Sequence, residues 1–285
     1  MDRILLGDNL PLLRAEQEGT VTMAYLDPPF NTGRAQTRRT LSTTADPDGD
    51  RTGFGGRRYA SRLLQQSSYR DSFDDYLAFL EPRLREVRRL LRGDGTMYLH
   101  VDYREAHYCK LLLDELFGRE CFLNEIVWAY DYGAKPRSRW PAKHDTILVY
   151  VKTPGGHHFD ADAVDREPYM APGLVTAEQR EKGKRPSDTW WHTIVSPTGR
   201  EKTGYPTQKP EGIVRRMVQA SSRPGDLCLD AFAGSGTLGA VAAKLGRRYL
   251  LIDESPRAYD VMCARLGAQN ARSASPSGVE GAASA

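Results

Sequence analysis

A tetrapeptide near the amino terminus combines a carboxylate, two prolines and an aromatic ring: Asp27-Pro28-Pro29-Phe30. The carboxylate of Asp27 can accept a hydrogen bond from an N–H group. The two prolines have no N–H to donate, and they fix the backbone so that the carbonyl of Pro28 can accept a second hydrogen bond. Phe30 offers a face on which a nucleic-acid base can stack, a contact worth about 1–3 kcal/mol. The tetrapeptide is therefore suited to hold a planar exocyclic amine.

Two acceptors directed at one amino group draw its lone pair out of conjugation with the ring, so that a weak nucleophile can attack an electrophilic methyl group in line. Such catalysis depends on positioning and electrostatic preorganisation, without a metal ion or a covalent intermediate. A base inside a duplex cannot present its amine in this way and must be flipped out. Taken alone, the tetrapeptide is also compatible with a rigid turn that ends a strand.

A second stretch, near the carboxyl terminus, is rich in glycine: Asp230-Ala231-Phe232-Ala233-Gly234-Ser235-Gly236-Thr237. With Gly239 it completes a GxGxxG pattern that opens a predicted helix, and glycines there let the backbone turn tightly and approach a ligand closely. Asp253, at the end of the next predicted strand, could accept hydrogen bonds from ribose hydroxyls. The pattern alone fits a dinucleotide, S-adenosylmethionine or a purely structural turn. Its late position and the amine-holding tetrapeptide favour S-adenosylmethionine.

The elements that must position these residues alternate between strands and helices. Strands are predicted at 20–26, 96–101, 125–129, 145–152, 226–231 and 248–253, and helices at 72–92, 104–117, 211–222, 236–245 and 256–270. This alternation predicts an α/β fold with a mostly parallel sheet covered by helices on both faces. In such folds ligands bind beyond the carboxyl ends of the strands, which is where Asp27 and the glycine turn begin.

The chain divides by composition. Residues 1–152 are predicted to form the catalytic half of one domain, with a flexible basic loop at 34–70 that is polar and lacks periodicity. Residues 153–205, rich in Pro, Gly, charge and aromatics, are predicted to form a small irregular target-recognition region. Residues 206–270 form the cofactor-binding half, and residues 271–285 a disordered tail.

Composition narrows the class of protein further. The 285 residues are 40% hydrophobic, enough for a core, and no apolar run is long enough to span a membrane. No signal peptide is recognisable, so we expect a cytoplasmic protein. The four cysteines are scattered without the spacing of a zinc site, and we expect reduced thiols and no metal.

The net charge of +3 does not by itself indicate nucleic acid, but the basic residues are unevenly distributed. Lys and Arg contacts to phosphates dominate DNA affinity. We predict DNA contacts in the 34–70 segment and beside the recognition region, at Arg34, Arg38, Arg39, Arg57, Arg58, Arg137, Arg139 and Lys143. Solvated loops are the alternative for such runs. Trp190 and Trp191 could contact DNA or pack in the core.

The order of these motifs resembles that of the bacterial β-class DNA amino-methyltransferases, which methylate adenine N6 or cytosine N4. In that class the DPPY-like motif comes first, then the target-recognition region, then the FxGxG motif. Further stretches agree, over residues 3–268: Gly7–Leu10, Lys143–Lys152, Ser187–Trp190, Tyr205–Glu211 and Leu250–Asp253. Phe30 stands where the family usually has Tyr, and it keeps the stacking face. Tyr205 stands where the family usually has His, so a hydrogen-bonding imidazole is absent there.

The resemblance implies a circularly permuted Rossmann-like fold and sequence-specific methyl transfer from S-adenosyl-L-methionine to double-stranded DNA. The aspartate of the first motif favours adenine N6 over cytosine N4. Asp27, Pro28, Pro29 and Phe30 would be catalytic. Cofactor contacts are implied for Asp8, Asp27, Thr207, Lys209, Asp230, Phe232, Gly234, Ser235, Gly236, Thr237 and Asp253.

The resemblance also extends to partners. It implies a homodimer, association with the nucleoid through DNA and, in a restriction-modification system, a cognate restriction enzyme on a separate chain; a solitary enzyme is the alternative. A methyltransferase acting on RNA or a protein amide normally has its cofactor motif first. A nicotinamide-type nucleotide-binding enzyme leaves residues 27–30 and 207–210 unexplained, and the intact motifs oppose an inactive DNA-binding relative.

Overall fold

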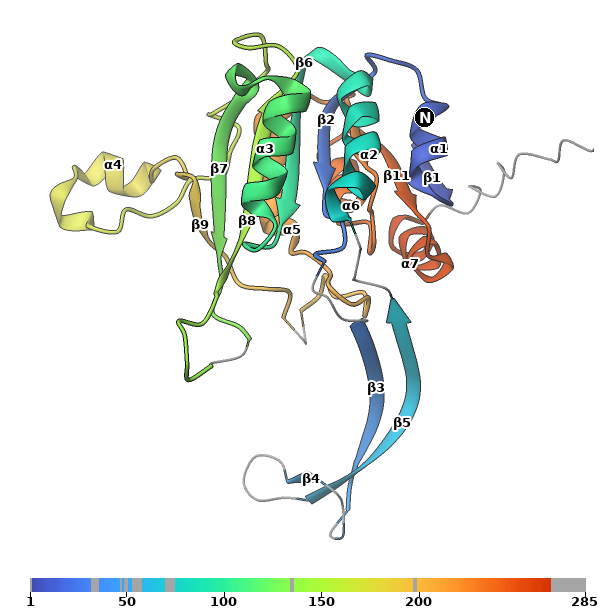
Figure 1. Ribbon diagram of the computed structural model, residues 1–285. Helices are drawn as coiled ribbons and strands as arrows, with labels where there is room; N and C mark the ends of the chain where they lie inside the picture. Colours follow the sequence, from blue (N-terminus) through green and yellow to red (C-terminus); the bar gives the residue numbers. More distant parts are fainter. Residues whose placement is uncertain are drawn as a thin grey trace, which may run out of the picture. The chain divides into compact units, whose positions relative to one another are not determined.

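The computed structural model describes residues 2–31, 36–46, 48, 51–52, 58–69, 75–133, 136–196 and 199–267 (Figure 1). The chain divides into two units, one made of residues 1–28 and 80–285 and the other of residues 29–79. The predicted tail at 271–285 lies outside the described residues.

The larger unit is built on an eight-stranded sheet in the order β1-β11-β10-β2-β6-β8-β7-β9. Its strands are β1 (Arg3–Leu6), β2 (Val21–Leu26), β6 (Leu91–Val101), β7 (Phe122–Ala129), β8 (His144–Val151), β9 (Thr189–Trp191), β10 (Leu227–Asp230) and β11 (Arg248–Asp253). From β1 to β6 every neighbouring pair is parallel, whereas β8 is antiparallel to both β6 and β7, and β9 is parallel to β7. The predicted mostly parallel sheet is confirmed.

The strand composition explains the central position of β2. All six residues of Val21–Leu26 are buried, as expected for a parallel strand covered on both faces. Beside it, β10 pairs in parallel so that Leu229 lies opposite Ala24. Two strands from opposite ends of the chain therefore end side by side. We call the side of the sheet at which the parallel strands end the carboxyl edge.

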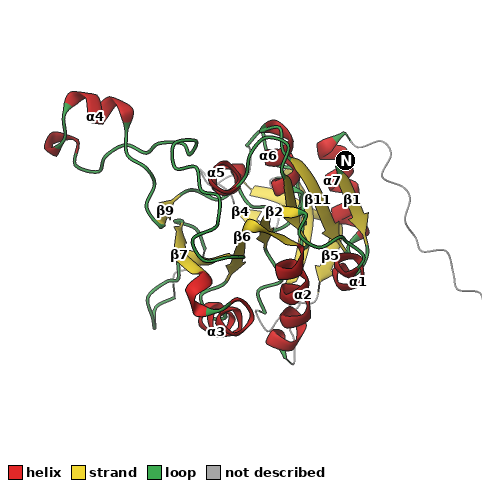
Figure 2. Ribbon diagram, turned by 90° about the horizontal axis from the view of Figure 1, so that it is seen from above, coloured by secondary structure: helices red, strands yellow, loops and turns green. Residues whose placement is uncertain are grey.

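Helices cover both faces of this sheet, with α1, α2 and α3 on one and α5, α6 and α7 on the other (Figure 2). The helices are α1 (Asn9–Arg14), α2 (Tyr76–Leu90), α3 (Ala106–Phe117), α4 (Ala177–Lys182), α5 (Glu211–Ser221), α6 (Thr237–Lys244) and α7 (Pro256–Leu266). Local signals set their ends: the Ser255 side chain caps α7, and Gly267 ends it in a left-handed conformation. Among the described residues, no helix has the length and apolar character needed to cross a membrane.

The region at 153–205 has more regular structure than its composition indicated. Thr176 and Gln179 form a capping box that starts α4, and Glu167 and Lys184 form an isolated antiparallel bridge. Strand β9 adds Thr189–Trp191 to the main sheet. The remainder, apart from a 3-10 turn at Pro172–Leu174, is irregular in its described residues.

The smaller unit contains an antiparallel sheet in the order β3-β5-β4, formed by β3 (Gln36–Ala45), β4 (Arg51–Thr52) and β5 (Arg58–Tyr69). The prediction of a loop without regular structure is wrong for these residues. Backbone hydrogen bonds between two long strands do not require an apolar face, and the threonine-rich run of β3 favours an extended backbone. A polar strand of this kind lacks the alternation by which strands are recognised.

Candidate functional site

Asp27 follows β2 directly, at the carboxyl edge, and is held there by Lys209 from the loop before α5. The ammonium of Lys209 donates to Oδ1 of Asp27 at 2.6 Å and to Oδ2 at 2.5 Å, across 182 residues of sequence. Both side chains are largely shielded from solvent, with exposures of 16% and 11%. Asp27 and the predicted cofactor loop are thus brought together at one charged contact.

A buried polar network lies beside this pair. His100, which ends the apolar run of β6, has no exposed side-chain surface. Its Nδ1 lies 2.8 Å from the Tyr25 hydroxyl and 3.9 Å from Oδ1 of Asp27, and its Nε2 lies 3.2 Å from Asp145. The hydroxyl of Tyr130 donates to the other oxygen of Asp145 at 3.0 Å. Side chains from β2, β6 and β8 and from the residue that follows β7 are therefore fixed to one another next to Asp27.

The network has a clear electrostatic character. Burial alone would raise the pKa of Asp145, but the hydrogen bond and charge of His100, with the charge of Lys209 and the Tyr130 hydroxyl, hold that pKa below its usual range. Burial, followed by the charge of Asp27, raises the pKa of Tyr25 well above its usual value. The Tyr25 hydroxyl lies against Nδ1 of His100 and the Asp145 carboxyl against Nε2, so both ring nitrogens have a hydrogen-bonding partner.

The glycine turn between β10 and α6 has no room for larger residues. Gly234 and Gly236 have positive φ angles of 50° and 71°. A Cβ on Gly236 would lie 2.9 Å from Cγ of Met262, and one on Gly234 would lie 3.3 Å from the ring of Tyr205. The backbone N–H of Gly234 donates to Asp253 at 2.8 Å, which ties the turn to the end of β11. The two glycines are required for the path of the backbone.

Three carboxyl groups surround this turn. Asp253 lies in register with Leu6 of β1, so Asp8, two residues later, belongs to the neighbouring strand end. Burial raises the pKa of Asp253, opposed by N–H groups of Ser255 and Gly234. Burial, together with the charges of Asp27 and Asp253, raises the pKa of Asp230 well above its usual range. Asp8 caps α1 and accepts a hydrogen bond from Arg83 at 2.9 Å. Acceptors at adjoining strand ends suit the hydroxyl and amino groups of a nucleoside.

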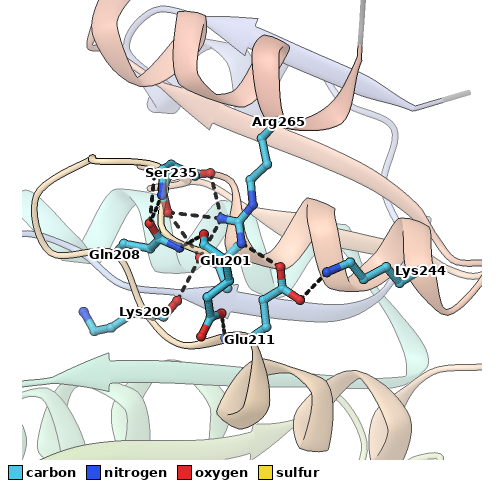
Figure 3. Close-up of polar contacts among 9 residues, drawn as sticks. Glu201, Gln208, Lys209, Glu211, Ser235, Lys244 and Arg265 are labelled. Atoms are coloured by element: carbon cyan, nitrogen blue, oxygen red, sulfur yellow. Dashed lines mark hydrogen bonds and ion pairs between the residues drawn. The ribbon is translucent and has the colours of Figure 1, made fainter. Parts of the chain in front are cut away.

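The side chains of Ser235 and Thr237 are buried. Arg265 of α7 contacts Ser235 and holds the turn (Figure 3). The guanidinium of Arg265 donates to the Ser235 carbonyl at 3.1 Å, to Oγ1 of Thr237 at 3.2 Å and to Glu211 at 2.8 Å. Thr237 in turn donates to the carbonyl of Lys209 at 3.1 Å. Sequence reasoning missed Arg265, which links the glycine turn to the loop that carries Lys209.

The remaining predicted cofactor residues are placed as follows. Thr207 is exposed and has a positive φ of 57°, and its neighbour Gln208 fixes the loop by accepting from the N–H of Thr203 and donating to the carbonyl of Glu201. Phe232 follows β10, and its N–H donates to Asp230 at 3.0 Å. Pro28 belongs to the larger unit, whereas Pro29 and Phe30 belong to the smaller one.

The predicted DNA-contact residues are distributed over both units. In the larger unit Arg137 and Arg139 are exposed between β7 and β8, while Lys143 donates to the carbonyls of Tyr132 and Gly133. In the smaller unit Arg58 is exposed on β5. Arg38 and Arg39 belong to β3, and Arg34 and Arg57 lie outside the described residues.

The tandem tryptophans have different environments. Trp190 is buried, at 6% exposure, and the guanidinium of Arg216 lies 5.3 Å from its ring centroid. Trp191 is 73% exposed. Core packing, which the sequence left open for one of the two, therefore applies to Trp190.

This geometry agrees with comparisons to known proteins. The chain is 27% identical over 267 residues to "Type II methyltransferase M.HpaI" of Haemophilus parainfluenzae, with 94% of this chain and 74% of that protein covered. It is 29% identical over 258 residues to "DNA adenine methyltransferase YhdJ" of Escherichia coli (strain K12), with coverage of 88% and 77%.

Among solved structures, the M1.HpyAVI-SAM complex matches with a TM-score of 0.60 at 21% identity, covering 93% of this chain and 99% of that one, so the two chains share a fold. Residues 21–263 match the family model for DNA methylases of the N6/N4 type. The chain therefore belongs to the N6/N4 DNA methylase family, whose methyl donor is S-adenosylmethionine.

Proposed function

We propose that this DNA methylase transfers the methyl group to N6 of adenine within a specific sequence of double-stranded DNA. Adenine is favoured over cytosine by the aspartate that opens the tetrapeptide and by the similarity to a protein named as a DNA adenine methyltransferase. The observation that carries the proposal is the Asp27–Lys209 contact, because it joins the amine-holding motif to the cofactor half of the chain.

The residues around the glycine turn fit the methyl donor. The backbone at Gly234 and Gly236 is positioned where a Cβ would collide with Tyr205 or Met262, and a line of carboxyl acceptors is formed by Asp8, Asp230 and Asp253. When bound, S-adenosylmethionine supplies a methyl group on a positively charged sulfur, which a neutral amine can attack. Asp8 and Asp253 would accept hydrogen bonds from its nucleoside part, with Phe232 beside the turn.

Asp27 would orient the target amine and accept its proton. Its carboxylate accepts an N–H of the target amine, directs the lone pair toward the methyl group and takes up the proton that the amine loses once the new N–C bond has formed. In the protein alone, the Lys209 ammonium donates to both Asp27 oxygens. The target amine must share or replace this donor. Pro28 would supply the second acceptor and Phe30 the stacking surface.

Sequencing of native DNA tests this proposal. Plasmid DNA from cells that express the wild type or Asp27→Ala is sequenced by a single-molecule method that distinguishes N6-methyladenine from N4-methylcytosine. We expect N6-methyladenine at one recurring sequence, absent in the variant. N4-methylcytosine would overturn the choice of base, and unmodified DNA from a protein that binds S-adenosylmethionine would overturn DNA as the substrate.

We further propose that residues 153–205 with the β7–β8 connection read the sequence, that the protein binds nucleoid DNA in the cytoplasm, and that it acts as a homodimer, with any cognate restriction enzyme on a separate chain. Membership of the DNA methylase family supports the DNA partner. Sedimentation of the purified protein with and without duplex DNA tests the dimer, which a single monomeric species at all concentrations would exclude.

A further inference from the structure

The connection between β7 and β8 extends from the carboxyl edge of the sheet, the same edge at which Asp27 lies. We refer to residues 130–143, of which 134 and 135 are outside the described part, as the β7–β8 loop. Ala129 pairs with His144 at its base, and Val101 of β6 pairs with Thr146. Only β6 separates β8 from β2 in the sheet. Figure 1 accordingly shows the loop on the side to which the arrowheads of β2, β6 and β7 point.

Large aromatic side chains are concentrated at this place. Trp140 is 94% exposed, Tyr132 66% and Trp191 73%. Trp191 ends β9 and pairs with Ala129, at the base of the loop. Within the described residues, these are three of the five exposed large aromatic side chains, the others being Tyr108 and Phe159. A single exposed aromatic residue needs no explanation, whereas a group of them beside a functional site indicates a binding surface.

The backbone of the loop is held in place while its side chains face solvent. Lys143 donates to the carbonyls of Tyr132 at 2.7 Å and Gly133 at 3.0 Å, and its own carbonyl accepts from the N–H of Tyr130 at 2.9 Å. Tyr130 is in turn fixed to Asp145. The loop is therefore anchored to the polar network beside Asp27.

The charge of the loop is positive. Arg137 and Arg139 are both exposed, and within the described part of the chain neither forms an ion pair. The acid present in the same loop is Asp131, which is exposed at its beginning. Exposed cations interleaved with aromatic rings match the phosphates and bases of a nucleic acid.

We propose that Tyr132, Arg137, Arg139, Trp140 and Trp191 form a surface that binds the DNA duplex beside the target base, and that Trp140 inserts into the base stack there. This inference rests on the proposed function. Extruding a base removes its stacking contacts, and an apolar wedge replaces part of them. Trp140 is suited to this because it is the most exposed of the three rings and is carried by a loop, whereas Trp191 is restrained by strand pairing. Arg137 and Arg139 would hold phosphates on either side.

Two oligonucleotide duplexes distinguish a wedge from a general contact. Both carry the sequence found by native sequencing, and one has an abasic site opposite the target base, which makes extrusion easy. We expect Trp140→Ala to lower kcat/KM on the fully paired duplex by about tenfold or more, as for loss of a base–aromatic stack, and to lower it less than threefold on the abasic duplex. Tyr108→Ala is the matched control, because Tyr108 is an exposed aromatic residue on α3, outside the segments proposed to contact DNA. It should change neither value.

An equal loss on both duplexes, or no loss on either, overturns the wedge. A change in the sedimentation of the DNA-free protein caused by Trp140→Ala would assign the surface to a contact between subunits and would also overturn the proposal.

Duplex binding measured by fluorescence anisotropy tests the surface independently of methylation. Arg137→Gln with Arg139→Gln should weaken binding and reduce the slope of log K against log salt by about two. An unchanged slope would contradict the surface even if the proposed reaction is correct. A wild type that binds duplex but methylates none would instead contradict the proposed function alone.

Discussion

The carboxyl edge of the sheet differs along its length. Where β11, β10, β2 and β6 end, the polar groups are buried or half-buried and bound to one another, as in the Asp27–Lys209 pair and the His100–Asp145 pair. Where β7, β8 and β9 meet the same edge, the side chains of the connecting loop and of Trp191 are exposed.

This difference matches the two tasks that we propose for the edge. A reaction that depends on preorganisation needs groups whose positions are set before the substrate arrives, and buried, fully paired side chains provide this. Binding a duplex and extruding a base instead needs side chains that are free to make new contacts. The two parts can be perturbed separately, and a substitution in one should leave the property of the other unchanged.

The largest effect is expected for Asp27→Ala. Because Asp27 is the proposed acceptor for the target amine, its removal should lower kcat by roughly a hundredfold to a thousandfold or more, as for loss of a preorganised hydrogen-bonding group. Affinity for S-adenosylmethionine, measured by calorimetry, should stay within a few-fold of the wild type. A variant that keeps full activity would exclude the mechanism proposed for Asp27.

A second substitution changes the glycine turn between β10 and α6. Gly236→Ala places a Cβ 2.9 Å from Met262 at a φ of 71°, and we expect about 1–3 kcal/mol of destabilisation with weaker cofactor binding. Gly246→Ala is the control, since Gly246 has a φ of 72° and no atom within 4 Å of such a Cβ. The difference between the two, measured by urea unfolding, isolates the close packing from the backbone strain. Equal effects would show that the contact with Met262 is unimportant.

The parts of this edge that could be predicted from the sequence are those with a local signal. Six buried residues followed by two prolines define the strand end at Asp27, and the glycines define the turn after β10. His100 and Asp145 could not be paired in advance, because nothing in the sequence of either strand indicates which strand lies beside it. Their contact, across 45 residues, depends on β8 pairing antiparallel to β6.

Arg265 gave no signal for a similar reason. In the sequence, Arg265 is one of several charged residues of a helix. Its partner Glu211 is 54 residues away along the chain, and its partner Thr237 in the glycine turn is 28 residues away. The hairpin of β3 and β5 was missed because most of its residues are polar and the few apolar ones, such as Leu41, Leu63 and Leu64, show no regular alternation. The residues of the two motifs could therefore be predicted from the sequence, whereas the distant side chains that hold those motifs in place could not.

A third substitution changes the buried polar network beside Asp27. His100→Gln should lower kcat by about tenfold, because His100 positions the strand ends beside Asp27 without contacting the target, and should leave cofactor affinity unchanged. The pKa of Asp145 is held below its usual value by His100, so its contribution to stability is present above that usual value, about 3.9, and is lost as the pH falls through the lowered pKa. The stability difference between wild type and variant should therefore be full at pH 6 and shrink below about pH 4. A pH-independent difference in urea midpoints would contradict the coupling.

The smallest effect is expected for substitutions that test whether the glycine turn and the loop that carries Lys209 act as one unit. Arg265→Leu removes donors to Ser235, Thr237 and Glu211, and Thr237→Val removes the donor to the Lys209 carbonyl. If the hydrogen bonds form one connected network, the free energies of unfolding of the two single variants and the double variant should show a coupling of about 0.5–2 kcal/mol. The affinity for duplex DNA should be the same in all three, because the exposed loop between β7 and β8 makes none of these contacts. Additive effects would mean that Arg265 stabilises α7 locally, and that Lys209 reaches Asp27 without help from the turn.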